Sequence, residues 1–176
     1  MDVKKLKEER HEQLARMRDT LMEELIACGL REPENENEPE ILTVVLDELG
    51  ETGDREGGIG EFFFAPSNEN DTVMHFCSVL TLKDELSREY LPQLFEAMSY
   101  INFRLPCGCY CIDREGTLLC YRITAPLPIN LSGEELFEQM NIVMSNAFIA
   151  ADLYADMLIK LSEGEKTIES VLNILI

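Results

Sequence analysis

The stretch GCYCIDREGTLLCYRIT at residues 108–124 carries the clearest structural signal in the chain. Two runs rich in aromatic and β-branched residues, 108–112 and 117–124, enclose the four residues DREG at 113–116. Such runs favour extended strands, and Asp at the first and Gly at the fourth position of a turn favour type I geometry. The stretch therefore predicts an antiparallel hairpin.

Upstream of this hairpin, three more segments have the composition of strands: 41–47, 59–65 and 72–82. The loops between them are rich in Gly or in Pro, Ser and Asn, and their lengths suit antiparallel hairpins. A helix is predicted next, at 92–101, because Pro92 suits the first position of a helix. Its buried side is expected to hold Leu94, Phe95, Met98 and Ile101.

A capping box, Ser132-Gly-Glu-Glu135, begins a long helix downstream of the hairpin. Apolar residues at helical spacing predict that this helix continues to about Leu161, and Gly164 is expected to stop it. Its predicted buried residues are Leu136, Met140, Val143, Met144, Ala147, Ala151, Tyr154, Leu158 and Leu161. Residues 167–176 predict a short packed helix.

Two prolines, Pro126 and Pro128, are expected to end the sheet edge that the hairpin forms. The amino-terminal residues 1–30 read as an amphipathic helix, and 31–40 as an acidic linker whose prolines and like charges oppose helix and strand. Residues 41–176 are predicted to form a single α+β domain packed with the N-terminal helix. The predicted order is α-βββ-α-ββ-α(α), with an antiparallel sheet.

Composition narrows the class of protein. A chain of 176 residues with 45% apolar and 28% charged residues fits one globular domain. The formal net charge of −19 repels phosphate backbones and anionic lipid, so we expect neither a nucleic-acid nor a membrane partner. The charged N-terminus does not resemble a signal peptide, which predicts a cytoplasmic protein with reduced cysteines and no bound cofactor.

Four cysteines near the hairpin, Cys107, Cys109, Cys111 and Cys120, suggest a zinc or redox site. Spacing opposes zinc, because alternate strand residues lie about 6.6 Å apart, whereas thiolates on one zinc ion lie under about 4 Å apart. We interpret these cysteines as small apolar residues of a sheet and keep the metal or redox site as the alternative. Sequence leaves open whether Cys120 faces Cys109, Cys111 or, with a bulged turn, Tyr110.

Another pair, His75 and Cys77, falls on one face of a predicted strand and invites a base and nucleophile interpretation. No acid is positioned to orient the histidine, and His11 lies among glutamates on the N-terminal helix. No phosphate-loop, zinc-protease, nucleophile-elbow or calcium-loop pattern occurs in the sequence. We therefore expect a protein without catalytic residues.

Three consecutive aromatic residues, Phe62, Phe63 and Phe64, place aromatic rings on both sides of one strand. At least one ring should leave the main core unless both faces of the sheet are covered. A partner subunit, a client peptide or the N-terminal helix would each provide that cover. These three residues are the candidates for partner binding.

The order of short motifs resembles the YbjN family of bacterial proteins, named as regulators of sensory transduction, whose fold is similar to that of type III secretion chaperones. The motifs are INFRLP at 101–106, GCYCID at 108–113, TLLCYR at 117–122 and PLPINLS at 126–132, within a match covering 41–164. The resemblance implies a twisted antiparallel sheet packed on helices, a homodimer, and protein binding rather than turnover. The charged N-terminal helix and the cysteine-rich hairpin depart from the family pattern.

Together these features lead to one main functional hypothesis. It is a non-enzymatic adaptor or chaperone-like module that dimerises and binds a partner segment across its sheet or along a sheet edge. A thiol or metal protein using the four hairpin cysteines is the alternative.

Overall fold

The computed structural model describes residues 41–46, 58–65 and 73–175, together with helical residues Lys5, Glu8, Glu12, Met22, Glu23, Ile26 and Ala27. Met22 is buried and belongs to the hydrophobic core. The predicted linker 31–40, His11 and Cys28 lie outside the described residues. The predicted domain boundaries therefore stay predictions.

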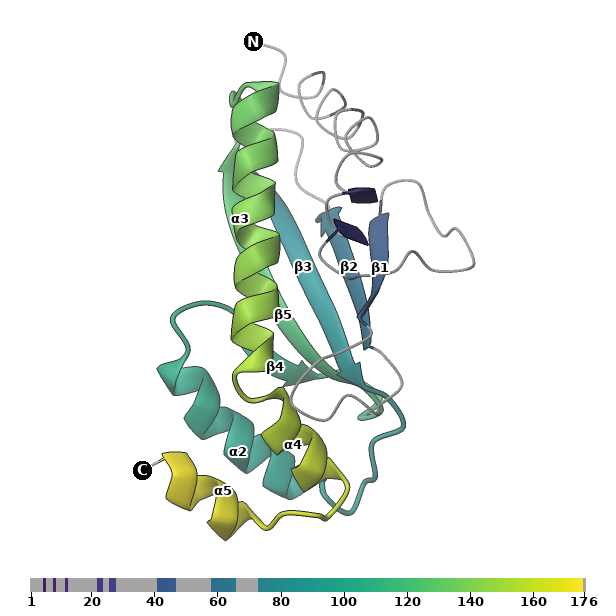
Figure 1. Cartoon of the computed structure of the whole chain (residues 1–176), viewed down its shortest axis with the longest axis vertical. Coiled ribbons are helices and arrows are strands. Elements are labelled where there is room, and N and C mark those ends of the chain that lie inside the picture. The colour runs from purple at the N-terminus through teal and green to yellow at the C-terminus, as the bar shows by residue number, and fades with distance from the viewer. Residues whose placement is uncertain are drawn as a thin grey trace.

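The centre of the molecule is an antiparallel sheet of five strands in the order β1-β2-β3-β5-β4 (Figure 1). The prediction of an α+β fold with three strands, a helix and a further hairpin is confirmed. The strands are β1 (Ile41–Leu46), β2 (Gly58–Phe64), β3 (Val73–Lys83), β4 (Cys109–Ile112) and β5 (Leu119–Pro128). In the turn of the last hairpin, the N–H of Gly116 donates to the carbonyl of Asp113 at 3.1 Å, as a type I turn requires.

The expectation that Pro126 and Pro128 end the sheet is wrong, because both lie within β5. They pair with His75 and Val73 of β3, whereas β4 reaches only as far as Arg122 along β5. Beyond that point one side of β5 has no partner strand among the described residues. A proline whose nitrogen faces such an edge removes no hydrogen bond from the ladder.

Besides the helical residues between Lys5 and Ala27, the described part of the chain contains the helices α2 (Leu91–Arg104), α3 (Gly133–Asp152), α4 (Ala155–Ser162) and α5 (Ile168–Leu175). The long helix α3 crosses one face of the sheet, and the other three gather near one end of it (Figure 1). Pro92 lies in the first turn of α2, as predicted. Phe95 was expected on the buried side but is 55% exposed. The buried positions of α2 follow the spacing of Leu94, Ala97, Met98 and Ile101, and Phe95 lies about 100° around the helix from Leu94.

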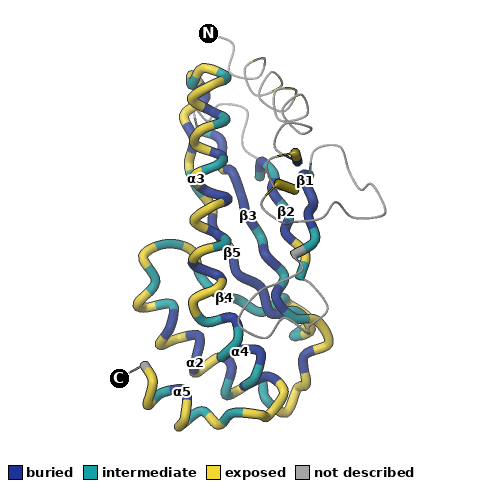
Figure 2. Tube along the Cα trace, in the orientation of Figure 1, coloured by how far each residue is buried: buried dark blue, intermediate teal, exposed yellow. Residues whose placement is uncertain are grey.

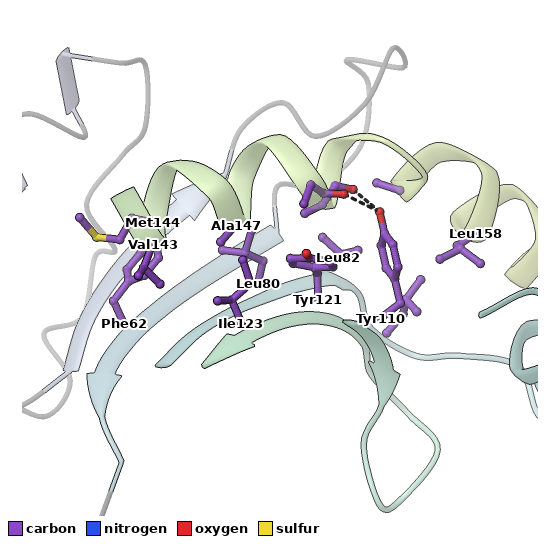
Figure 3. Close-up of a cluster of buried hydrophobic side chains, with 14 of the residues drawn as sticks. Phe62, Leu80, Leu82, Tyr110, Tyr121, Ile123, Val143, Met144, Ala147 and Leu158 are labelled. Carbon is purple, nitrogen blue, oxygen red and sulfur yellow. Dashed lines mark hydrogen bonds between the residues drawn. The ribbon is translucent and has the colours of Figure 1, made fainter. Parts of the chain in front are cut away.

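The prediction of one helix from the capping box to Leu161 is wrong. The helix ends at Asp152 and a second one, α4, begins at Ala155, bent by 50° from the first. The break leaves backbone carbonyl and N–H groups without helical partners, and the Tyr110 hydroxyl forms hydrogen bonds with them (Figure 3). Its oxygen lies 2.7 Å from the Ala151 carbonyl and 3.0 Å from the Ala150 carbonyl, and it accepts the Tyr154 N–H at 3.1 Å.

The main core lies between α3 and the sheet, where Figure 3 shows Phe62, Leu80 and Ile123 pointing toward the helix. The Phe62 and Phe148 rings meet edge to face, with centroids 5.7 Å apart. The predicted capping box is present at Ser132 and Glu135. Among the described helices, none by itself is long and apolar enough to cross a membrane, although the bent pair α3 and α4 meets that criterion of length and composition when taken together.

Candidate functional site: the open face of the sheet

The face of the sheet opposite α3 is the candidate site, and we call it the open face. The described helices lie on the other face or near the end of the sheet (Figure 1). Alternate residues of each strand point to the open face. Its members are Ile41, Thr43, Val45, Ile59, Glu61, Phe63, Val73, His75, Cys77, Val79, Thr81, Cys109, Cys111, Cys120, Arg122, Thr124, Pro126 and Pro128.

Strand register divides the open face into two halves of different chemistry. On β1, β2 and β3 apolar side chains dominate: Ile59 is 46% exposed, and Phe63 and Val79 are half-buried. The same half also contains Glu61 and the exposed His75. On β5 and β4 the face carries three thiols, Arg122 and Thr124, followed by the exposed prolines of β5. The two halves meet where Val79 pairs with Arg122 and Cys77 pairs with Thr124.

The structure separates the three predicted partner-binding phenylalanines. Phe62 and Phe64 are buried on the helix-covered face, where Phe64 also packs against Phe76 with ring centroids 5.3 Å apart. Phe63 lies on the open face opposite Cys77 of β3. Of the three rings, Phe63 is therefore the one that a partner at the open face could reach.

Two buried thiols on the open face contact hydroxyl groups. Cys77 is fully buried, and its Sγ lies 3.5 Å from the Thr124 Oγ1 and 3.7 Å from the Arg122 Nη2. Cys120 Sγ lies 3.7 Å from the Thr81 Oγ1. His75, predicted to share a face with Cys77, does so but is exposed while the thiol is buried.

Register also settles which residue faces Cys120. Cys120 pairs with Cys111, while Cys109 pairs with Arg122. Burial raises the pKa of Cys111 to about 11 and also raises the pKa of Cys120, against the opposing effect of the Thr81 hydrogen bond. Both groups are thiols at neutral pH, whereas nucleophilic attack needs a thiolate.

The proposed zinc set does not come together among the described residues. Cys107 precedes β4, packs against the core, and its carbonyl accepts the Tyr121 hydroxyl at 2.6 Å. Gly108 next to it has a φ of +64°, and a Cβ there would lie 2.4 Å from the Tyr121 hydroxyl oxygen. Within the described ranges no three His, Cys, Asp or Glu side chains lie where they could hold one metal ion.

The two edges of the sheet differ in a way that sequence reasoning missed. At the β4 edge the Asn102 amide imitates a neighbouring strand: its Nδ2 donates to the Tyr110 carbonyl at 2.9 Å, and its Oδ1 accepts the Tyr110 N–H at 2.8 Å. The sequence signal is an Asn near the end of a helix that precedes a Gly-led strand. At the other edge, β1 pairs only with β2 among the described residues and contains neither proline nor a charged side chain. An edge strand without proline or charged side chains is able to pair with another strand.

Comparisons with known proteins give a limited result. No family model matches the sequence, and no curated protein matches it. The fold is similar to the crystal structure of YbjN from E. coli, which has been proposed as a transcription regulator, with a TM-score of 0.41 and 12% identity over 80% of this chain and 92% of that chain. Membership of the YbjN family stays a prediction.

Proposed function

We propose that this protein is a non-enzymatic protein-binding module, chaperone-like or a regulatory adaptor, that holds a partner segment against the apolar half of the open face. The observation that carries the proposal is the exposure of Ile59, 46%, next to the half-buried Val45 on β1. The half-buried Phe63 and Val79 lie further along the same face, around Glu61. Apolar side chains that cluster on a surface favour contact with another polypeptide.

The adjacent β1 edge supports the same function. A partner in an extended conformation would gain main-chain hydrogen bonds along Ile41–Leu46 while its alternate side chains reach the apolar half. The opposite edge is less suited, because Asn102 already occupies the polar groups of Tyr110 there. A second copy of the chain is one such partner, and the expected homodimer would use this edge and face.

Binding through the open face is tested by changing it without changing the core. Ile59→Ser and Phe63→Ser remove apolar side chains from the face, and Ile174→Ser, at a 62% exposed position on α5, is the matched control. Light scattering at micromolar concentration and pull-down from lysate are measured for all three. We expect Ile59→Ser and Phe63→Ser to lose dimer or captured protein, while Ile174→Ser retains both.

Two results would contradict the proposal. One is a monomeric wild-type chain that retains no protein. The other is binding that all three variants retain, since the contact surface would then lie elsewhere.

A further inference from the structure

A second apolar surface lies on the opposite side of the molecule, along the outward side of α3. Ile142 and Ile149 of α3, and Leu153 directly after its last residue, are 46%, 66% and 58% exposed. We call these three residues the outer stripe. Figure 2 shows the alternation along α3 between buried positions facing the sheet and exposed positions facing away. The fold does not use the outer stripe for its own core.

Helix geometry places the outer stripe in one line. At 100° per residue, positions seven and eleven residues beyond Ile142 lie within about 20° of its direction. Exposed Asn146 lies between Ile142 and Ile149 near the same line. Spacings of seven and four residues are those of a helix that contacts a second helix. The outer stripe therefore has the geometry of a helix-docking seam.

Charge on the flank of the stripe is entirely negative. Glu134, Glu138 and Asp152 lie about 40 to 80° to one side of the Ile142 line. Helix α3 contains no Lys or Arg. A shallow depression begins at the same flank, where Phe137 and Ile142 lie among polar residues: Glu134, Glu138, Asn141, Ser145 and Asn146. An apolar floor beside carboxylates suits a ligand that is both apolar and cationic.

We propose that the outer stripe docks an amphipathic helix of a partner protein, whose apolar side lies on Ile142, Ile149 and Leu153 and whose adjacent positions carry Lys or Arg. This goes beyond the proposed function, because the stripe lies on α3 and the open face lies across the sheet. The local charges argue against a second copy of the chain at this surface, because two copies would bring the carboxylates of Glu134, Glu138 and Asp152 against one another with no cation on α3 between them. The same charges repel an anionic membrane.

A designed peptide tests this with the full chain. The probe is a fluorescent Leu/Lys helix of about three heptads with Leu at the a and d positions. Two peptides are compared with it: a scrambled Leu/Lys peptide without the apolar side, and a Leu/Glu helix. Fluorescence anisotropy titrations give the dissociation constants at low and high salt. We expect binding of the Leu/Lys helix alone, weakened by salt.

Substitutions locate the binding to α3. Ile149→Ser should weaken binding about tenfold, whereas Ile174→Ser, which removes a comparably exposed isoleucine on α5, should leave it unchanged. Glu138→Lys should also weaken binding, whereas Glu115→Lys, with the same change in net charge at the exposed hairpin turn, should have little effect. These positions are exposed, so the variants should fold.

Several outcomes would overturn the proposal. Equal affinity for the scrambled peptide, or no response to Ile149→Ser, would show that the peptide binds by charge alone. Self-association that Ile149→Ser abolishes would assign the stripe to a second copy. Because Ile59→Ser and Phe63→Ser test the open face separately, either surface can fail without the other.

Discussion

The two faces of one sheet differ in what they contribute to the protein. On the helix-covered face, Phe62, Phe76 and Leu80 are fully buried against α3 and its neighbours. On the open face, Phe63 and Val79, which neighbour Phe62 and Leu80 in the chain, are only half-buried, and Ile59 is exposed. A sheet that is covered on one face needs apolar residues on that face alone, yet this sheet has them on both. The covered face forms the main core, and the open face, although Thr43 and Cys77 are buried in it, is the surface that we propose for recognition.

The largest difference between the faces should appear at adjacent phenylalanines. Phe62→Ala leaves a cavity under α3 and should lower the free energy of unfolding by about 3 to 5 kcal/mol. Phe63→Ala removes a half-buried ring and should cost about 1 kcal/mol, since the site is partly open to water. Urea unfolding followed by circular dichroism measures both. Equal losses would mean that the open face is packed as tightly as the covered one.

A smaller effect is expected at Tyr110, on the covered face at the break between α3 and α4. Tyr110→Phe keeps the ring but removes the hydroxyl that bonds the Ala151 carbonyl and the Tyr154 N–H, and should cost about 1 to 3 kcal/mol. Tyr100→Phe, at a 46% exposed position on α2, is the control and should change nothing. Thermal unfolding of both variants measures the two changes in stability. A Tyr110→Phe chain as stable as wild type would mean that the bend needs no hydroxyl.

The covered face also contains a buried hydroxyl group in apolar surroundings. Ser78 is fully buried, and its hydroxyl has no hydrogen-bond partner among the described residues. Ser78→Ala should therefore raise the free energy of unfolding by about 1 kcal/mol.

Ser162 supplies the matched control, because it is also buried but donates to the Ile159 carbonyl at 2.6 Å. Ser162→Ala should lower the free energy of unfolding by about 1 kcal/mol. A loss of stability in both variants would indicate that the Ser78 hydroxyl has a partner in solution.

The smallest effect concerns reactivity on the open face. Because burial raises the pKa of Cys111 to about 11, its alkylation by iodoacetamide at pH 8 should be slower than in the urea-unfolded chain. The rate should rise about tenfold per pH unit toward pH 11, as the thiolate fraction does. Mass spectrometry of the labelled peptide reports the rate, and fast labelling at neutral pH would restore the redox alternative.

The raised pKa also fixes the sign of the pH dependence. The folded state holds the Cys111 proton more tightly than the unfolded state, so its contribution to stability is complete below about pH 9. That contribution is lost as pH rises toward 11.

Local chemistry predicted the features that neighbouring residues define. The turn at 113–116 forms because its own residues provide its hydrogen bonds. The Asp113 carbonyl accepts the Gly116 N–H, and the Asp113 carboxylate accepts the N–H groups of Thr117 and Leu118, both at 2.6 Å. The Ser132 capping box likewise involves residues close in the sequence. So does the Gly164 stop, with a φ of +73°, although it follows α4 and not the single long helix that was predicted. Each prediction succeeded because its interacting groups lie within a few positions.

Contacts between distant residues escaped prediction. The Tyr110 hydroxyl and the bend it supports are 40 or more residues apart in the chain, and no pattern near Tyr154 announces the break. Asn102 reaches the β4 edge only because α2 ends beside that strand. The pairing register of the strands escaped prediction for the same reason. A shift of one residue would move the side chains of a strand from one face of the sheet to the other.

The sequence by itself determined the strands and the helices before and after them in their correct order, apart from the break between α3 and α4. It could do so because helix and strand patterns repeat at spacings of two to four residues. It also determined the acidic charge and that aromatic rings fall on both sides of β2. Only the tertiary structure decided which ring is buried, which cysteine faces Cys120, and which apolar residues remain exposed as the open face and the outer stripe. Those outcomes depend on which element covers which surface, and covering is a property of the assembled chain rather than of any local segment.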